Sequence, residues 1–156
     1  MICRRLVSAD HLQKLEFAMS TTVATILLSD AQQMIERSIA AARALDLACS
    51  IAVVDSSGHL LSFIRQDGAM AGSAALAIDK AFTAHLFNNP TDALNALAQP
   101  GAELYGIQHS HGGRVVVFGG GIPIRFEGRT IGAIGVSGGT VAEDIAIAEA
   151  GSAASS

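Results

Sequence analysis

Charged side chains are scarce in this chain. Only 15% of its 156 residues are Asp, Glu, Lys or Arg, and the net charge is −4. The few Lys and Arg residues are scattered, which argues against a nucleic-acid-binding surface, because such a surface needs clustered basic side chains. Half of the residues are hydrophobic, and a surface with so little charge favours contacts between subunits. We therefore expect a homo-oligomer, a dimer or larger, that binds no nucleic acid.

Cysteines and long apolar runs are also scarce. Cys3 and Cys49 have no C-x-x-C companion, so we expect neither a zinc site nor a disulfide framework, and the simplest setting is the reducing cytoplasm. Polar residues at positions 10–16 interrupt the apolar core that an export signal after Arg4 and Arg5 would need. No apolar run reaches the roughly 20 residues of a membrane helix, so no membrane association is expected.

The segment from residue 115 to residue 143 contains most of the local patterns that predict structure: three strands, two glycine clusters and a helix start. Its β-branched, aromatic and alternating apolar residues predict three strands. The turn Glu127-Gly128-Arg129 joins the last two of them. The predicted strands cover residues 115–118, 122–126 and 130–136.

The third of these strands has one face of large side chains and one of small ones, because successive side chains alternate between faces. Ile134 and Val136 share a face with Gly132, whereas Ile131 lies beside Ala133 and Gly135 on the other. We therefore expect something to lie close against the small face.

A glycine corner, made of Gly119, Gly120 and Gly121, ends the first of the three strands. Without a Cβ atom the backbone can turn sharply there, or it can approach a ligand closely. We include these three glycines among the candidate ligand-binding residues.

A second glycine cluster connects the third strand to a helix. Ser137, Gly138 and Gly139 form this strand–helix junction, and Thr140 with Glu143 has the spacing of a capping box. The helix should therefore begin at about Thr140. Free backbone N–H groups at such a junction can bind a carboxylate or a phosphate; the simpler interpretation is a tight connection to a capped helix.

The remaining sequence predicts helices that flank an antiparallel sheet. Helical apolar spacing follows Ser29, which has Gln32 at the capping-box position. Turn formers at residues 55–58 should join two strands into a hairpin. The expected helices cover residues 29–46, 71–86 and 91–99, and the hairpin strands cover residues 50–54 and 59–64. The predicted fold class is therefore α/β (α+β), with one five-stranded antiparallel sheet and flanking helices.

The predicted domain covers residues 29–151. Residues 1–28 precede it as an N-terminal extension, in which Met19 is an alternative start, and residues 152–156 follow it as a flexible tail. No internal repeat interrupts the domain.

Two segments resemble a known family. They are GAMAGSAALAIDKAFTAHLFNNPT at residues 68–91 and FGGGIPIRFEGRTIGAIGVSGGTVAEDIAIAEAG at residues 118–151. The K-A-x-T-A motif, the G-G-x-P-I corner and the E-G-x-x-I-G-A-I-G-V-S-G-G run occur together and in order. In these motifs the chain resembles the GlcG/HbpS-like family, which includes the C-terminal domain of PduO-type proteins.

This resemblance implies a profilin- or PAS-like fold and assembly into dimers or higher oligomers. Some family members bind haem or a corrinoid, and some are encoded with glycolate or diol metabolism, so haem or a corrinoid is the expected cofactor. Lys80 and both glycine clusters lie in the shared motifs. The His109-Ser110-His111 segment lies outside the family pattern, and no family haem ligand can be matched to a position in this chain.

Lys80 lies in a predicted helix, residues 71–86, that has almost no charge and should be buried on most sides. An unpaired buried ammonium would cost several kcal/mol, so Lys80 must reach solvent, an acidic neighbour or an anionic ligand. A solvated lysine beside Asp79 and a ligand-binding lysine both remain open. Arg65 and Asp67, which follow the first hairpin, are candidates for the same pocket, although each is also explained by an ordinary turn.

His109 and His111 lie in an irregular loop at residues 101–113. Two residues apart on an extended segment, they project to one side and can share a metal or face a tetrapyrrole iron. A third ligand such as His85 or Glu103 would be needed for a metal ion. The alternative is a pair of exposed loop histidines.

Three functions remain open. The first is a homo-oligomer that binds a tetrapyrrole or a related carboxylated small molecule as an accessory to a metabolic pathway, with Lys80 and the junction amides on the ligand carboxylates and Tyr105 against the ligand. The second is an enzyme for a small hydroxy or oxo acid, with Lys80 and Arg65 on the carboxylate and His109 or His111 as acid and base. The third is a structural oligomer without a ligand.

Overall fold

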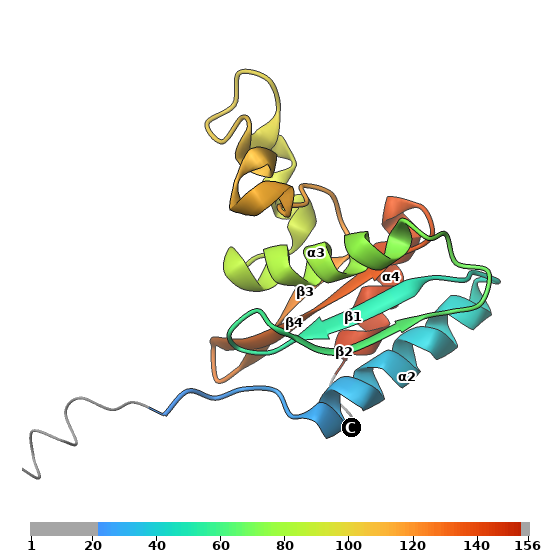
Figure 1. The fold of residues 1–156 in the computed structure, drawn as a ribbon. Coiled ribbons are helices and arrows are strands. Elements are labelled where there is room, and N and C mark those ends of the chain that lie inside the picture. Colours follow the sequence, from blue (N-terminus) through green and yellow to red (C-terminus); the bar gives the residue numbers. More distant parts are fainter. Residues whose placement is uncertain (1–21, 154–156) are drawn as a thin grey trace, which may run out of the picture.

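A computed structural model describes residues 22–153 (Figure 1). Most of the predicted extension, with Met19, and residues 154–156 of the predicted tail lie outside the described residues. None of the helices between residues 22 and 153 is long and apolar enough to cross a membrane. The regular elements are α2 (Leu28–Ala44), β1 (Ser50–Val54), β2 (Leu60–Arg65), α3 (Ser73–Leu86), β3 (Gly121–Phe126), β4 (Arg129–Ser137) and α4 (Val141–Ser152).

The four strands form one antiparallel sheet in the order β2-β1-β4-β3. β1 lies inside the sheet and is buried along its whole length. Its residue Ile51 pairs with Ile64 of β2 on one side and with Val136 of β4 on the other. Both predicted hairpins are therefore confirmed, and they join into one sheet through β1 and β4.

The prediction of a fifth strand at residues 115–118 is wrong, since these residues form no strand. Val115 and Val116 are nevertheless buried. The amide of Val116 donates to Thr83 Oγ1 (3.0 Å), and the carbonyl oxygen of Val117 accepts from Asn95 Nδ2 (3.1 Å). Two side chains thus take the backbone partners that a neighbouring strand would have offered, and the apolar run packs without joining the sheet.

Large apolar side chains fill the space between the sheet and helices α2 and α4, which cover the same face (Figure 1). Ile51 and Val53 of β1 and Ile134 and Val136 of β4 have no exposed surface there. The apolar stripe predicted for the first helix, residues 31, 34/35, 39, 42 and 45, is confirmed except at its end. Ala31, Met34, Ile35 and Ala42 are buried and Ile39 is partly buried against the core, whereas Leu45 follows the helix and is 46% exposed.

Small side chains line the opposite face of the sheet, and α3 lies directly against it. Ala52 of β1 and Ala133 and Gly135 of β4 face this helix. A Cβ atom at Gly135 would overlap the carbonyl oxygen of Ala77 and lie 2.5 Å from the amide nitrogen of Ala81. The expectation that something lies close against the small face is therefore confirmed, and that element is α3.

The outer face of α3 remains uncovered in the single chain. Leu76 is 37% exposed and Leu86 is 42% exposed. The prediction that this charge-poor helix is buried on most sides is nevertheless confirmed, because only Ala75, Leu76 and Leu86 of its 14 residues are exposed and the others are buried or half-buried.

The capping-box prediction for the last helix is confirmed. Thr140 Oγ1 accepts from the amide of Glu143 (3.3 Å), and Glu143 Oε2 accepts from the amide of Thr140 (2.7 Å). Two of the N–H groups that a helix start leaves free are therefore satisfied within α4 itself.

The capping prediction for the first helix is wrong. α2 starts at Leu28 after Leu27, and no side chain caps it, so Ser29 lies inside the first turn. The buried Ile26, whose amide donates to the carbonyl oxygen of Ile131 (3.1 Å), holds the extended segment that precedes the helix. A tertiary contact therefore sets the start of this helix.

Residues 91–114 project beyond α3, in yellow and orange in Figure 1. We call them the projecting segment. The short helix predicted after Pro90 consists of two 3-10 turns, η1 (Thr91–Leu94) and η2 (Ala96–Ala98), and two more, η3 (Ile107–His109) and η4 (His111–Gly113), follow. Thr91 does not cap η1 with its side chain; its Oγ1 accepts from the amide of Gly121 (3.0 Å) and so ties the segment to β3.

Candidate functional site

Lys80 has the largest side chain that is completely buried in the described part of the chain. Its Nζ donates to the carbonyl oxygen of Val136 (2.8 Å) and to Asp144 Oδ2 (2.6 Å). The ring of Phe118 lies with its centroid 5.1 Å from Nζ, within the range of a cation–π interaction. The ammonium therefore forms a buried ion pair with Asp144, and the interpretation of Lys80 as a solvated lysine is wrong.

Asp144 links Lys80 to the strand–helix junction. One carboxylate oxygen accepts from Lys80, and the other, Oδ1, accepts from the amide of Gly139 (2.9 Å). Asp144 is itself only 3% exposed. Lys80 and the junction amide thus hold a carboxylate between them, and that carboxylate belongs to the same chain.

The roles of Lys80 and Gly139 in ligand binding stay predictions. Because Asp144 already accepts from both residues, a ligand carboxylate could bind them only by displacing Asp144. Burial lowers the pKa of Lys80 more than the hydrogen bond and the charge of Asp144 raise it. A ligand carboxylate in the place of Asp144 would keep Lys80 paired but would leave the buried charge of Asp144 without its partners, which is costly.

The glycine corner lies directly over this ion pair. Gly120 has a φ of 113°, and a Cβ atom there would lie 2.7 Å from the carbonyl oxygen of Val136 and 2.8 Å from Lys80 Nζ. Gly119 and Gly121 are equally confined, the first by α4 and the second by α3 and Thr91. Close packing within the chain is therefore sufficient to explain why this corner is built from glycine.

A small pocket of about 210 Å³ opens beside Gly120 and Gly121. The charged side chains that line it are Asp92 and Glu149, and no Lys or Arg side chain joins them. A ligand carboxylate would meet two negative charges in this pocket. Its electrostatics therefore favour a neutral or cationic group over the carboxylate that the sequence suggested.

Arg65 and Asp67 line a different pocket, of about 370 Å³, where α2 ends and β2 leaves the sheet. The other residues of its lining are Ile39, Arg43 and Gln66. Lys80 is fully enclosed and does not line this pocket. The structure therefore does not bring Arg65 and Asp67 together with Lys80.

Ser137 and Gly138 belong to the packed interior around the junction. Ser137 pairs with Ser50 of β1 and is buried, and a Cβ atom at Gly138 would lie 2.6 Å from the Cα of Cys49. Burial, with a smaller contribution from the charge of Asp144, raises the pKa of the Cys49 thiol to about 11. Cys49 is therefore a buried thiol that stays protonated at neutral pH in the folded chain.

His109 and His111 both lie exposed on the projecting segment, in η3 and η4. Nδ1 of His111 lies 2.9 Å from Ser110 Oγ. The His111 ring packs edge-on against Phe82 and Phe87, with centroids 6.2 and 6.0 Å apart. These contacts orient the ring and leave its Nε2 without a hydrogen bond to the described residues.

The third metal ligand required by the sequence prediction is not in place. Within residues 22–153, no three His, Cys, Asp or Glu side chains are grouped to hold a metal ion, so neither His85 nor Glu103 completes a site with the two loop histidines. Tyr105 lies on the same projecting segment and is 64% exposed. Its predicted contact with a ligand stays a prediction.

His85 lies in α3 against the turn between β1 and β2. Its Nδ1 is buried without a hydrogen-bond partner in the described part of the chain. Burial lowers the pKa of His85 from its ordinary value of 6.5, against smaller opposing effects of the Asp55 charge and a backbone hydrogen bond at Ser56. The folded protein therefore takes up this proton at a lower pH than the unfolded chain does.

We expect this difference to make the protein less stable as the pH falls below about 6.5, because the unfolded chain binds the His85 proton first. Once the pH is below the folded pKa, both states are protonated and the loss is complete. Urea unfolding of the wild type and His85→Gln, over the range from about pH 7.5 to pH 5, measures it. His85→Gln should lose less stability over this interval. His59→Gln, which alters an exposed histidine of the same turn, serves as the control and should lose as much as the wild type. If the free energy of unfolding changes equally with pH in all three proteins, the assignment to His85 is refuted.

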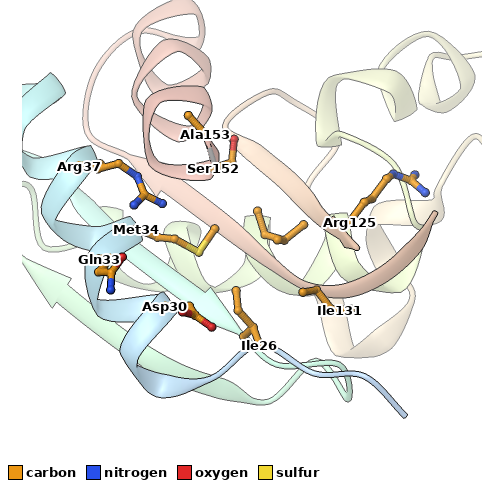
Figure 2. A pocket seen from close by; sticks show the side chains of 10 residues that line it. Ile26, Asp30, Gln33, Met34, Arg37, Arg125, Ile131, Ser152 and Ala153 are labelled. Carbon is orange, nitrogen blue, oxygen red and sulfur yellow. The ribbon is translucent and has the colours of Figure 1, made fainter. Parts of the chain in front are cut away.

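A further pocket, of about 400 Å³, lies between α2, the β3–β4 hairpin and the end of α4 (Figure 2). Ile26, Met34, Ile124 and Ile131 supply its apolar lining. Arg37 also lines it, and donates two hydrogen bonds to the carbonyl oxygen of Gly151, from Nε (3.2 Å) and a terminal nitrogen (2.8 Å). None of the ligand-binding or metal-binding residues predicted from the sequence lines this pocket.

Sequence reasoning missed Asp144 and Arg43. The local signal for Asp144 is its place in the first turn of α4, where a negative charge complements the helix dipole. That signal does not reveal its partner Lys80, 64 residues away in the sequence. Arg43 carries only the signal of a basic residue in the last turn of α2.

The fold and these sites define the class of the protein: a small α+β domain with one antiparallel sheet, helices on both faces, and a buried lysine–aspartate pair beneath a glycine corner. The family described as haem-degrading protein HbpS-like matches residues 26–153. The chain therefore belongs to the HbpS-like family, which confirms the resemblance found in its sequence motifs.

Comparisons with individual proteins agree with this assignment. The chain is 40% identical over 130 residues to an uncharacterised 15.0 kDa protein of the dhaT-dhaS intergenic region of Citrobacter freundii, over 83% of this chain and 92% of that protein. It is 35% identical to the corrinoid adenosyltransferase PduO of the same organism, over 83% of this chain but only 39% of that protein. A solved PduOC:haem complex is 33% identical, with a TM-score of 0.80, over 83% of this chain and 94% of that one.

Proposed function

We propose that this protein is a homo-oligomer that binds a tetrapyrrole, haem or a corrinoid, and that His111 of the projecting segment supplies the metal ligand. The observation that carries the proposal is the haem complex of PduOC, a related protein of the same fold. The similarity to PduO, a corrinoid adenosyltransferase of which this chain spans a minor part, supports the corrinoid as the second ligand to test.

A tetrapyrrole removes the need for a cluster of protein ligands. Its four ring nitrogens already hold the metal, so one imidazole is enough to complete an axial position. His111 is better prepared for this role than His109, because Ser110 and the rings of Phe82 and Phe87 orient its imidazole. A hydrogen bond at one ring nitrogen that leaves the other free is the usual arrangement of a ligating histidine.

The apolar macrocycle also needs a cover, and the proposal assigns it to a second subunit. The outer face of α3 and the projecting segment both expose large apolar or aromatic side chains. Leu76, Leu86, Leu97 and Tyr105 are 37%, 42%, 42% and 64% exposed. Exposed apolar area of this kind supports both self-association and the binding of a flat apolar ligand.

The two alternative functions receive less support from the geometry. An enzyme for a small hydroxy or oxo acid would need Lys80 and Arg65 on one carboxylate, yet Lys80 is buried beneath the glycine corner and Arg65 lies in the pocket at the end of β2. A structural oligomer without a ligand would give no function to the imidazole of His111, which Ser110, Phe82 and Phe87 hold in one orientation.

An absorbance titration of the purified protein with haemin, and separately with a cobalamin, tests the proposal. We expect saturable binding at one site per chain with a shifted Soret or corrin band. His111→Ala should weaken this binding about tenfold or more, equal to about 1.4 kcal/mol, because the axial ligand is lost. Light scattering on the same samples should give a mass that is a multiple of 16.0 kDa.

His109→Ala and His59→Ala serve as matched controls, because both remove exposed histidines. Neither should change the affinity. The proposal fails if no saturable band shift is seen with either ligand, or if all three histidine variants bind as the wild type does. A monomeric mass would refute the oligomer.

A further inference from the structure

The pocket at the end of β2 contains two arginine side chains. Arg43 and Arg65 both line this space of about 370 Å³. Neither guanidinium makes a hydrogen bond or an ion pair with residues 22–153. The carbonyl oxygens at the end of α2, which a last-turn arginine often binds, accept instead from the backbone amides of residues 45–47.

A third group of donors in this pocket is held in a fixed orientation. Gln66 Oε1 accepts from the amide of Cys49 (3.0 Å) and from its thiol (3.3 Å). Because both partners are donors, the oxygen of the side-chain amide must face Cys49. The nitrogen of that amide is turned away with two N–H donors, and it has no partner in the described residues.

A tight turn presents the one acidic residue of the pocket. The amide of Ala69 donates to the carbonyl oxygen of Gln66 (3.1 Å), and Gly68 has a φ of 86°, as the third position of a type II turn requires. Asp67 stands at the second position of this turn. It forms no ion pair with Arg43 or Arg65, since the two salt bridges of the described chain lie elsewhere.

We propose that this pocket is a second binding site, for a small carboxylic acid that also carries a hydroxyl or amino group. Arg43, Arg65 and the Gln66 amide would hold the carboxylate, and Asp67 would accept a hydrogen bond from the other group. The site is separate from the tetrapyrrole proposed above, and neither proposal depends on the other.

The chemistry of the lining favours this class of ligand. Guanidinium groups bind carboxylates through paired, charge-assisted hydrogen bonds, which are stronger than hydrogen bonds between neutral groups. Two arginines and one aspartate leave a net positive charge for one carboxylate. Ile39, one helical turn before Arg43 on the same face of α2, adds an apolar wall that suits a short carbon chain.

Ligand-observed NMR on the full chain tests the site with three probes at constant ionic strength: lactate, propionate and inorganic phosphate. Lactate should bind saturably and more tightly than propionate, which lacks the hydroxyl group. Arg43→Gln and Arg65→Gln should each weaken lactate binding about tenfold or more. Asp67→Ala, which removes the side-chain acceptor, should bring lactate and propionate to similar affinities.

Arg129→Gln is the matched control, because Arg129 is an exposed arginine at the opposite end of the sheet. It should bind lactate like the wild type, and His111→Ala should do so as well, which separates this test from the haemin titration. Absence of saturable lactate binding overturns the proposal, as does binding that both pocket arginine variants leave unchanged. Saturable binding of phosphate without binding of lactate overturns the assignment to carboxylic acids.

Discussion

Lys80→Met is expected to lower the free energy of unfolding by about 3–5 kcal/mol. The substitution keeps most of the side-chain volume but removes the ammonium. Asp144, which is 3% exposed, would then keep only the amide of Gly139 as a partner for its buried charge. Urea unfolding at a fixed chain concentration measures the loss, because an oligomer unfolds in a concentration-dependent manner.

Removing both charges should restore most of the lost free energy of unfolding. In Lys80→Met with Asp144→Leu no buried charge remains, and exchange of a buried ion pair for apolar side chains is often neutral or stabilising. Asp79→Asn is the control, since it weakens the half-buried pair with Arg114 (2.8 Å), which is far more solvated than Lys80–Asp144, and it should cost about 1 kcal/mol. A loss in Lys80→Met no larger than that of the control would show that the pair contributes little.

The same variant decides what Lys80 does for a ligand. If Lys80 serves only the structure, folded Lys80→Met should bind haemin with the affinity of the wild type, because its charge is already neutralised by Asp144. A large loss of haemin affinity in the folded variant would instead mean that a ligand carboxylate displaces Asp144, as the sequence-based hypothesis of a lysine clamp requires.

Gly135→Ala is expected to destabilise the fold by about 3 kcal/mol or more. The added Cβ would overlap the carbonyl oxygen of Ala77 and lie 2.5 Å from the amide nitrogen of Ala81. Both atoms belong to the backbone of α3, so the whole helix has to move away from the sheet. The midpoint of thermal unfolding should fall by about 6–12 °C, or the protein should fail to fold.

Gly72→Ala is the matched control for this experiment. Gly72 precedes α3 with right-handed helical angles, and a Cβ atom there would meet nothing within 4 Å. It should be neutral or slightly stabilising, since alanine reduces the freedom of the unfolded chain. A wild-type midpoint for Gly135→Ala would mean that α3 does not lie as close to the sheet as this geometry requires.

Local sequence patterns predicted the elements whose partners lie nearby in the chain. The hairpin at residues 50–64 and the hairpin that ends in β4 follow from alternation and turn residues. The capping box of Thr140 and Glu143 joins residues only three apart. The small face of β4 required only the alternation of side chains along one strand.

The predictions of secondary structure failed where contacts with a distant part of the chain, rather than local residue type, determine the backbone conformation. Residues 115–118 have the composition of a strand, but Thr83 and Asn95 satisfy their backbone. Ser29 has the spacing of a cap, but the contact of Ile26 with Ile131 accompanies an N-cap at Leu27, two residues earlier. Propensity is a weak determinant wherever such tertiary contacts compete with it.

The sequence by itself determined the family, the α+β class, most helices and strands, and the presence of a lysine that must be neutralised. Each of these depends on residue type and on short-range spacing. Only the tertiary structure decided that Asp144 neutralises Lys80, that α3 covers the small face of β4, and that Arg65 meets Arg43 rather than Lys80. These pairings join residues far apart in the chain, and they depend on how the helices pack against the sheet, which no local pattern encodes.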